Sequence, residues 1–182
     1  MAKLVSTTYG DALFELALEE NKIDSVSEEV TFLKDVFKEN DELLKIMNHP
    51  KVPKEGKVSL VQKIFTNQIS DDLVGFLTVV VTKGRYNEIF EIFDYYEAKV
   101  REYKNIGVAK VTSAVELSAE KKQQIEERLL AITKYTSFQM DFHLDESIIG
   151  GLIIKIDDKV VDNSIKTKLE TMSRQLAKIQ LN

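Results

Sequence analysis

Apolar residues in the first hundred positions recur with the three-to-four-residue period of an α-helix. The pattern predicts six short helices, over residues 6–20, 26–37, 42–47, 53–65, 70–83 and from 87 to about 100. Helix-stopping residues agree with these bounds, because Asn48-His49-Pro50 follows the third helix and Gly84 follows the fifth. Six short helices with brief connections predict a helical bundle.

The pattern changes to that of a mixed α/β segment after Asn105-Ile106-Gly107. We expect strands over residues 107–116 and 137–144, with a helix over 118–134 between them. A run rich in β-branched residues, 148–156, then reaches a turn at Asp157-Asp158-Lys159 before a second short run at 160–161. This arrangement predicts a β-hairpin. The pair Gly150-Gly151 lies inside the first strand of that hairpin, where a bulge or the close approach of another backbone best explains it.

From Ser164 onwards the period is helical again. One stripe is apolar and is expected to face a core, with the basic residues largely off it: Ile165, Leu169, Met172, Leu176 and Ile179. The predicted fold class is therefore α+β, with an N-terminal six-helix bundle followed by a small C-terminal α/β domain that has a β-hairpin and a closing helix.

The charge of the chain supports the same division. Residues 1–105 carry 14 basic and 19 acidic side chains, whereas residues 106–182 carry 11 of each, so the net charge of −5 falls entirely on the first part. We expect two domains, over residues 1–105 and 106–182.

The C-terminal run resembles the signature of the δ subunit of F-type ATP synthases, which is called the oligomycin-sensitivity-conferring protein in mitochondria. The matching positions include a structural set of five, Gly150, Gly151, Asp158, Asp162 and Ser164, and seven apolar ones, Leu152, Ile154, Val160, Val161, Ile165, Leu169 and Leu176. The N-terminal segment 9–14, Ala17 and the break at 50–53 also resemble that family. Asp157 and Asn163 stand where many members carry glycine, and both residue types tolerate a left-handed backbone.

The resemblance implies a non-catalytic stator subunit without a cofactor. Such a subunit links the F1 head, through the N-terminus of the catalytic α subunit, to the b subunit of the peripheral stalk of F0. It further implies one copy in each complex, a monomer when free, and a place at the cytoplasmic face of a bacterial membrane, reached only indirectly through F0.

The first and fifth predicted helices are more apolar than one core face requires. Seven of the nine residues Leu73–Val81 are apolar, which a central helix buried on all sides would also explain. In the resembled family these two helices receive the N-terminal helix of the α subunit, as a helix in a groove. The residues that we expect to line this groove are Tyr9, Ala12, Leu13, Leu16, Phe76, Val79 and Val80.

The contact with the b subunit is expected in the C-terminal domain. The closing helix offers four basic residues for it, Lys166, Lys168, Arg174 and Lys178. A solvated face would show the same charges, so both interpretations stay open.

Composition argues against several other classes of function. A net charge of −5 with four arginines disfavours nucleic-acid binding, and the lack of cysteine excludes disulfides and thiolate chemistry. His49 and His143 lack metal-ligand spacing, and no phosphate-binding glycine motif is present. No apolar run approaches the roughly 20 residues that span a bilayer, and residues 1–6 lack the layout of a signal peptide. Two alternatives remain: a free-standing helical adaptor that binds an amphipathic peptide, and a small nucleotide-dependent enzyme.

Overall fold

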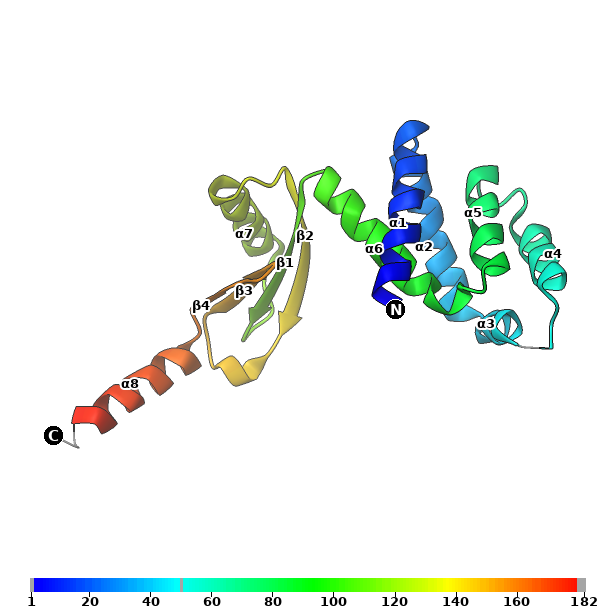
Figure 1. Ribbon diagram of the computed structural model, residues 1–182. Coiled ribbons are helices and arrows are strands. Elements are labelled where there is room, and N and C mark those ends of the chain that lie inside the picture. The colour runs from blue at the N-terminus through cyan, green and yellow to red at the C-terminus, as the bar shows by residue number, and fades with distance from the viewer. Residues whose placement is uncertain (1, 50, 180–182) are drawn as a thin grey trace. The chain divides into compact units, whose positions relative to one another are not determined.

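The computed structural model describes residues 2–49 and 51–179, and it divides the chain into two compact units (Figure 1). One unit extends up to Val100 and the other begins at Arg101. Helix α6 (Ile89–Tyr103) runs across this division, five residues before the boundary that composition suggested.

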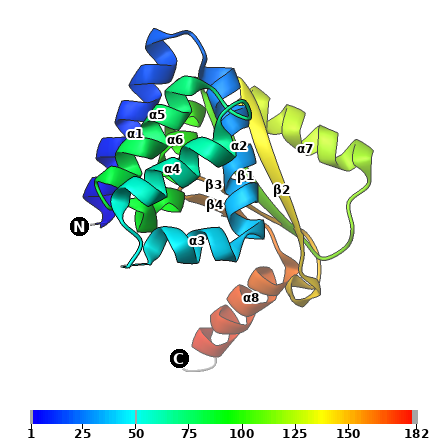
Figure 2. The same cartoon turned by 90° about the vertical axis from the view of Figure 1, so that its right-hand side faces the viewer.

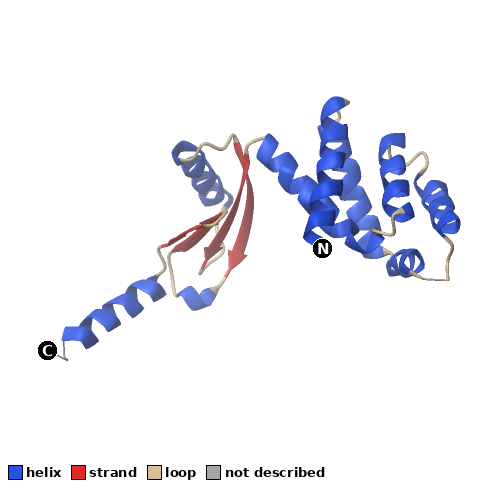
Figure 3. Ribbon diagram, viewed as in Figure 1, coloured by secondary structure: helices blue, strands red, loops and turns tan. Residues whose placement is uncertain are grey.

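In the residues that the structure describes, the named elements of the first unit are all helices (Figure 3). Before α6 it contains a 3₁₀ turn, η1 (Tyr86–Glu88), and five α-helices: α1 (Ala2–Glu19), α2 (Ile23–Glu39), α3 (Asp41–Asn48), α4 (Lys54–Phe65) and α5 (Asp71–Thr82). The six predicted helices are confirmed. Their ends differ by a few residues, most at α1, which begins at Ala2 and not at Ser6.

The core of this unit is built around α2 and α6. Helix α2 buries Val26, Val30, Leu33 and Phe37 at the helical spacing that its sequence predicts. The Phe37 ring stacks on Phe93 at a centroid distance of 6.3 Å, and three further rings meet it edge to face: Phe65, Tyr86 and Phe90. Such pairs contribute beyond the apolar area that they bury.

Helix α1 is held closely against α6. A Cβ atom on Gly10 would lie 2.4 Å from the Tyr95 ring, so only glycine allows this approach. One residue later, the Asp11 carboxylate accepts hydrogen bonds from the Lys99 ammonium and, at 3.2 Å, from the Tyr95 hydroxyl. These contacts fix the face that α1 turns away from the core.

The second unit is a four-stranded sheet with two helices, so the predicted α+β fold class is confirmed. Its strands are β1 (Ile106–Ser113), β2 (Ser137–Leu144), β3 (Leu152–Ile156) and β4 (Lys159–Asp162), in the order β2-β1-β3-β4. Helix α7 (Ala119–Ile132) connects the parallel pair β1 and β2, while β3 and β4 form the antiparallel hairpin. Few of the described apolar residues of this unit are buried: Ala109, Val111, Leu129, Phe138 and Ile148.

The glycine pair lies before the hairpin, which corrects its predicted place inside a strand. A short 3₁₀ turn, η2 (Glu146–Ile148), takes the first residues of the expected strand, and β3 begins only at Leu152. Gly151 has a φ of +82°, and a Cβ there would lie 2.3 Å from the carbonyl oxygen of Asn163. The close approach of another backbone is therefore the reason for this glycine.

The two positions where relatives were expected to have glycine behave differently. Asp157 has a φ of +50°, as its place in the β3–β4 turn suggested. Asn163 is not in the left-handed region, so its tolerance of that conformation is not used, and it presents its carbonyl oxygen to Gly151.

Helix α8 (Ile165–Ile179) does not bury its apolar stripe in a core, contrary to expectation. Ile165, Leu169 and Met172 are 43%, 52% and 59% exposed, and the side chains of Leu176 and Ile179 lie outside the described ones. The helix leaves the end of the hairpin and extends away from the sheet (Figure 1). Its direction separates the stripe from the sheet that could have covered it.

Candidate functional site

The first candidate surface combines α1 and α5, which lie side by side (Figure 2). The rings of Tyr9 and Phe76 meet edge to face, with centroids 6.5 Å apart and an angle of 73° between the planes. Five of the seven predicted groove residues keep exposed area, and we call them the α1–α5 face: Tyr9, Ala12, Leu16, Phe76 and Val79. Ala12 and Val79 are exposed, Val79 over 49% of its surface.

The other two predicted groove residues belong to the core. Leu13 and Val80 are 1% and 0% exposed, so they cannot line an open groove. Each follows an exposed residue of its helix, Ala12 or Val79, and a step of about 100° turns the next side chain inward. Apolar character did not distinguish these residues from their exposed neighbours.

A contact across the unit sets the position of α5. The Glu29 carboxylate of α2 accepts hydrogen bonds from the Ser70 N–H at 3.0 Å and from the Ser70 hydroxyl at 2.7 Å. Ser70 occupies the N-cap of α5, but its hydroxyl makes no capping bond there, so the negative charge of Glu29 serves the helix N-terminus instead. Lys22 adds an ion pair with Asp72 at 3.2 Å.

The second candidate surface is the basic side of α8. Lys166, Lys168 and Arg174 are exposed, and Arg174 lies 3.8 Å from Glu170 in a solvated pair. The side chain of Lys178, the fourth predicted contact, lies outside those that the structure describes. Hydrogen bonds from Ser147 lower the pKa of Asp145, and the charge of Lys166 adds a smaller effect in the same direction. The three side chains otherwise belong to an open helix face.

The start of α8 is fixed by the residues of the predicted family signature. The Asp162 carboxylate accepts from the Ser164 N–H at 2.8 Å and from the Thr167 hydroxyl at 2.8 Å. The hydrogen bonds from the Ser164 backbone and side chain, and then that from Thr167, hold the pKa of Asp162 below its usual value. The buried Ser164 hydroxyl caps the helix by accepting from the Thr167 N–H at 3.2 Å.

The other residues of the structural set precede the start of α8 in the chain. The Ile165 N–H donates to the Gly150 carbonyl at 2.9 Å, and the Ile165 side chain lies 2.6 Å from where a Cβ of Gly150 would be. Asp158 lies exposed in the β3–β4 turn. The signature therefore joins the glycine pair to the first turn of α8.

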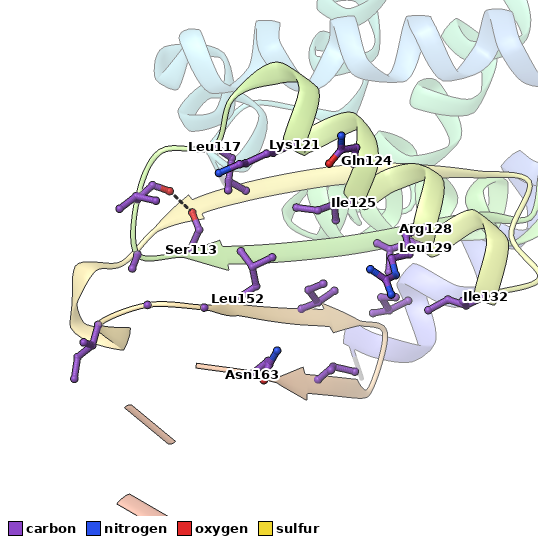
Figure 4. Close-up of a pocket in the computed structure, with 18 residues that line it drawn as sticks. Ser113, Leu117, Lys121, Gln124, Ile125, Arg128, Leu129, Ile132, Leu152 and Asn163 are labelled. Carbon is purple, nitrogen blue, oxygen red and sulfur yellow. Dashed lines mark hydrogen bonds between the residues drawn. The ribbon is translucent and has the colours of Figure 1, made fainter. Parts of the chain in front are cut away.

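A third surface, which the sequence did not predict, is an apolar groove of about 740 Å³ in the second unit (Figure 4). Helix α7 supplies Ile125, Leu129 and Ile132 to one wall, and the other side carries apolar residues of the hairpin: Leu152, Ile154, Ile156 and Val161. The α7 residues recur at helical spacing, a pattern that fits a helix packed on a core as well as one that lines a groove. The only sequence signal was the high apolar content of the short hairpin, which a single covering helix cannot bury.

The titratable residues show no constellation for catalysis in the described part of the chain. His143 Nε2 lies 2.7 Å from the Asp141 carboxylate on the exposed side of a strand, and His49 Nδ1 accepts from the Lys51 N–H at 3.2 Å. Residues 2–49 and 51–179 contain no group of three or more His, Asp or Glu that could hold a metal ion. None of their helices is both long and apolar enough to cross a bilayer.

Comparison with known proteins gives concordant matches over nearly the whole chain. The model of the family described as ATP synthase delta (OSCP) subunit matches residues 5–176. The ATP synthase subunit delta of Lachnoclostridium phytofermentans is 59% identical over 181 residues, with full coverage of both chains. That of Brevibacillus brevis is 33% identical, with 96% of this chain and 99% of the relative covered.

A solved structure shares the fold. A chain of the mitochondrial ATP synthase hexamer of Toxoplasma gondii superposes with a TM-score of 0.69 at 20% sequence identity. The match covers 94% of this chain and 97% of that one, so it includes both units.

Proposed function

The chain belongs to the ATP synthase delta (OSCP) family, and we propose that it is a non-catalytic stator subunit of an F-type ATP synthase. The observation that carries this proposal is the 59% identity to an ATP synthase subunit delta across the full length of both chains. In this role the chain ties the catalytic head to the peripheral stalk, so that the torque of the rotor drives ATP synthesis and does not turn the head.

We assign the contact with the head to the α1–α5 face. Its five residues present a mixed aromatic and aliphatic surface on two neighbouring helices, which suits the apolar side of an amphipathic helix. The partner is the N-terminal helix of the catalytic α subunit. The core residues Leu13 and Val80 support the two helices from behind and do not touch the partner.

We assign the contact with the stalk to the second unit. Here the partner is the C-terminal end of the b subunit, and the basic residues Lys166, Lys168 and Arg174 of α8 lie exposed on a helix that extends beyond the sheet. The chain is present once in each complex, is a monomer when free, and lies at the cytoplasmic face of the bacterial cell membrane through its partners.

A joint of this kind needs strength and slow dissociation, and it needs no reaction of its own. Apolar helix contacts give slow dissociation because the buried area must be exposed again before the partners separate. The chain divides into two units after Val100, so the contact with the head and the contact with the stalk each fall in a separate unit.

Copurification tests the proposal directly. The tagged full chain, expressed with the head and stalk subunits of its own organism, should recover both. A version that ends at Asn105 should keep the head and lose the b subunit. Recovery of neither subunit set by the full chain contradicts the proposed function and favours the alternative of a free-standing helical adaptor.

A further inference from the structure

We propose that the groove between α7 and the β3–β4 hairpin binds an amphipathic helix of a partner protein whose apolar stripe is flanked by acidic residues seven positions apart. The inference deepens the proposed stalk contact, on which it rests, because it gives that contact a surface and a chemistry. Within the second unit, it gives the apolar part of that contact a preformed concave site in addition to the basic side of α8.

The length of the groove suits a helix. Its lining extends along α7 from Leu117, just before the helix, to Ile132, its last residue. The 14 residues of α7 extend over about 21 Å at 1.5 Å per residue, so an occupant lying alongside would be a helix of about four turns. The hairpin side offers an aliphatic strip against which such a helix can pack.

The sheet leaves room for a second helix on this face. Helix α7 covers the β1–β2 side, where Leu129 packs with Ala109 and Phe138. Val161 of the edge strand β4 and Ile132 of α7 remain 65% and 73% exposed on the two sides of the groove. A packed helix would remove this apolar surface from water, which is the main source of affinity in helix-in-groove recognition.

Positive charge follows one edge of the groove. Lys121, Gln124 and Arg128 of α7 stand at successive turns of the helix (Figure 4). Lys121 and Arg128 are seven residues apart, which aligns them on one side of α7 about 10.5 Å apart. No lining residue is acidic, and no ion pair within the described chain uses either side chain.

Ile149 is a second sign that this surface serves binding. It has a φ of +69°, a region that β-branched residues rarely adopt, and its side chain is 61% exposed at the groove. An exposed isoleucine in a strained backbone contributes little to folding. Contact with a partner would supply the burial that the free chain lacks.

The charges also argue against the chain's own α8 as the occupant. Its exposed stripe at Ile165, Leu169 and Met172 is flanked by three basic residues, Lys166, Lys168 and Arg174, and one acidic residue, Glu170, so its net positive charge would lie against Lys121 and Arg128. In addition, the hydrogen bonds of Asp162 and Ser164 hold the first turn of α8 in place. The same repulsion disfavours α8 of a second copy.

Two designed peptides test the charge requirement on the full chain. Each has about 18 residues and an identical leucine stripe, flanked in one by glutamates seven positions apart and in the other by lysines at the same positions. Fluorescence anisotropy should show about tenfold tighter binding of the glutamate peptide, since two partly exposed ion pairs replace two repulsions.

Charge reversal in the protein gives the matched test. The double variant Lys121→Glu/Arg128→Glu should invert the preference, so that the lysine peptide binds more tightly. Ile132→Asp should weaken both peptides. Lys110→Glu, on the opposite face of β1, should change neither affinity. All four positions are exposed, so unchanged thermal unfolding is the expected control.

The inference is overturned if both peptides bind with equal affinity, or if the double variant keeps the preference for the glutamate peptide. It is also overturned if the peptides shift the NMR signals of Tyr9 and Phe76 and not those of the residues that line the groove. Binding to anionic lipid vesicles that the double variant abolishes, without peptide binding, assigns the surface to a membrane and equally overturns it. Copurification with head and stalk despite failure of these tests leaves the proposed function standing and removes only this inference.

Discussion

At the scale of single residues, two glycines show how backbone requirements differ between a packed site and an open one. Gly151 combines a left-handed φ of +82° with the carbonyl of Asn163, which would lie 2.3 Å from a Cβ. Gly84 has a similar φ of +69°, but nothing lies within 4 Å of the place of its Cβ. One position needs glycine for two reasons, and the other for one.

We therefore expect Gly151→Ala to destabilise its unit by more than about 2 kcal/mol, and Gly84→Ala to destabilise its own by only about 1 kcal/mol. A left-handed conformation costs an L-residue about 1–2 kcal/mol, and at Gly151 the clash with a backbone atom adds to it. Urea unfolding followed by the amide NMR signals of each unit measures both values. Equal losses would show that the approach of Asn163 contributes nothing.

At the scale of elements, the start of α8 depends on the carboxylate of Asp162. Asp162 accepts from Ser164 and Thr167, and these bonds lower its pKa in the folded chain. A lowered pKa means that the charged form contributes stability above the usual pKa of about 3.9 and loses it as the pH falls through the folded value. In the apolar stripe of α8, Ile165 lies against Gly150, whereas Leu169 and Met172 are more than half exposed. The hydrogen bonds of Asp162 and Ser164 at the first turn therefore set the orientation of the helix.

We expect the first turn of α8 to loosen as the pH falls below about 4, because protonation of Asp162 removes its acceptor charge. The amide signals of Ser164 and Thr167 should move together with the Asp162 carboxyl carbon in an NMR titration. Asp162→Asn should abolish this pH dependence. Asp158→Asn, which removes a carboxylate from the neighbouring turn, should leave it unchanged, and a loss of the transition in that variant would contradict the assignment.

At the scale of the whole molecule, the proposed work is divided between two units with different kinds of surface. The first offers a shallow apolar face on two helices that a well-packed core supports. The second has a small core, an open groove and an exposed helix stripe. Apolar surface of this extent is typical of a chain that is completed by partners.

The division predicts that binding to the head and folding can be separated. Val79→Glu should weaken binding of a peptide from the N-terminus of the α subunit at least about tenfold, since a charge would enter an apolar contact. Its melting temperature should stay near that of the parent because Val79 is half exposed. Phe32→Glu, at a similarly exposed apolar residue of α2, is the control and should bind normally in isothermal titration calorimetry. Equal effects of both variants would argue against the α1–α5 face.

The sequence by itself determined what depends on neighbours along the chain. Helical periods predicted the six helices, and stop signals placed the ends of the third and the fifth. The turn at Asp157 and the start of the last helix near Ser164 followed from residues within a few positions. The signature near the C-terminus was enough to identify the family. Its residues are close in sequence because they connect the glycine pair, the β3–β4 hairpin and the first turn of α8. These features need no knowledge of distant contacts.

The tertiary structure alone decided which apolar residues face a core and which face water. Periodicity shows that a side of a helix is apolar, but it does not show whether the chain itself covers that side. Leu13 and Val80 turned inward, the α8 stripe turned outward, and the groove beside α7 arose because one helix covers only part of a sheet. The bond from Ser70 to Glu29 joins residues 41 positions apart, a distance at which the folded packing, and not the local pattern, brings side chains together.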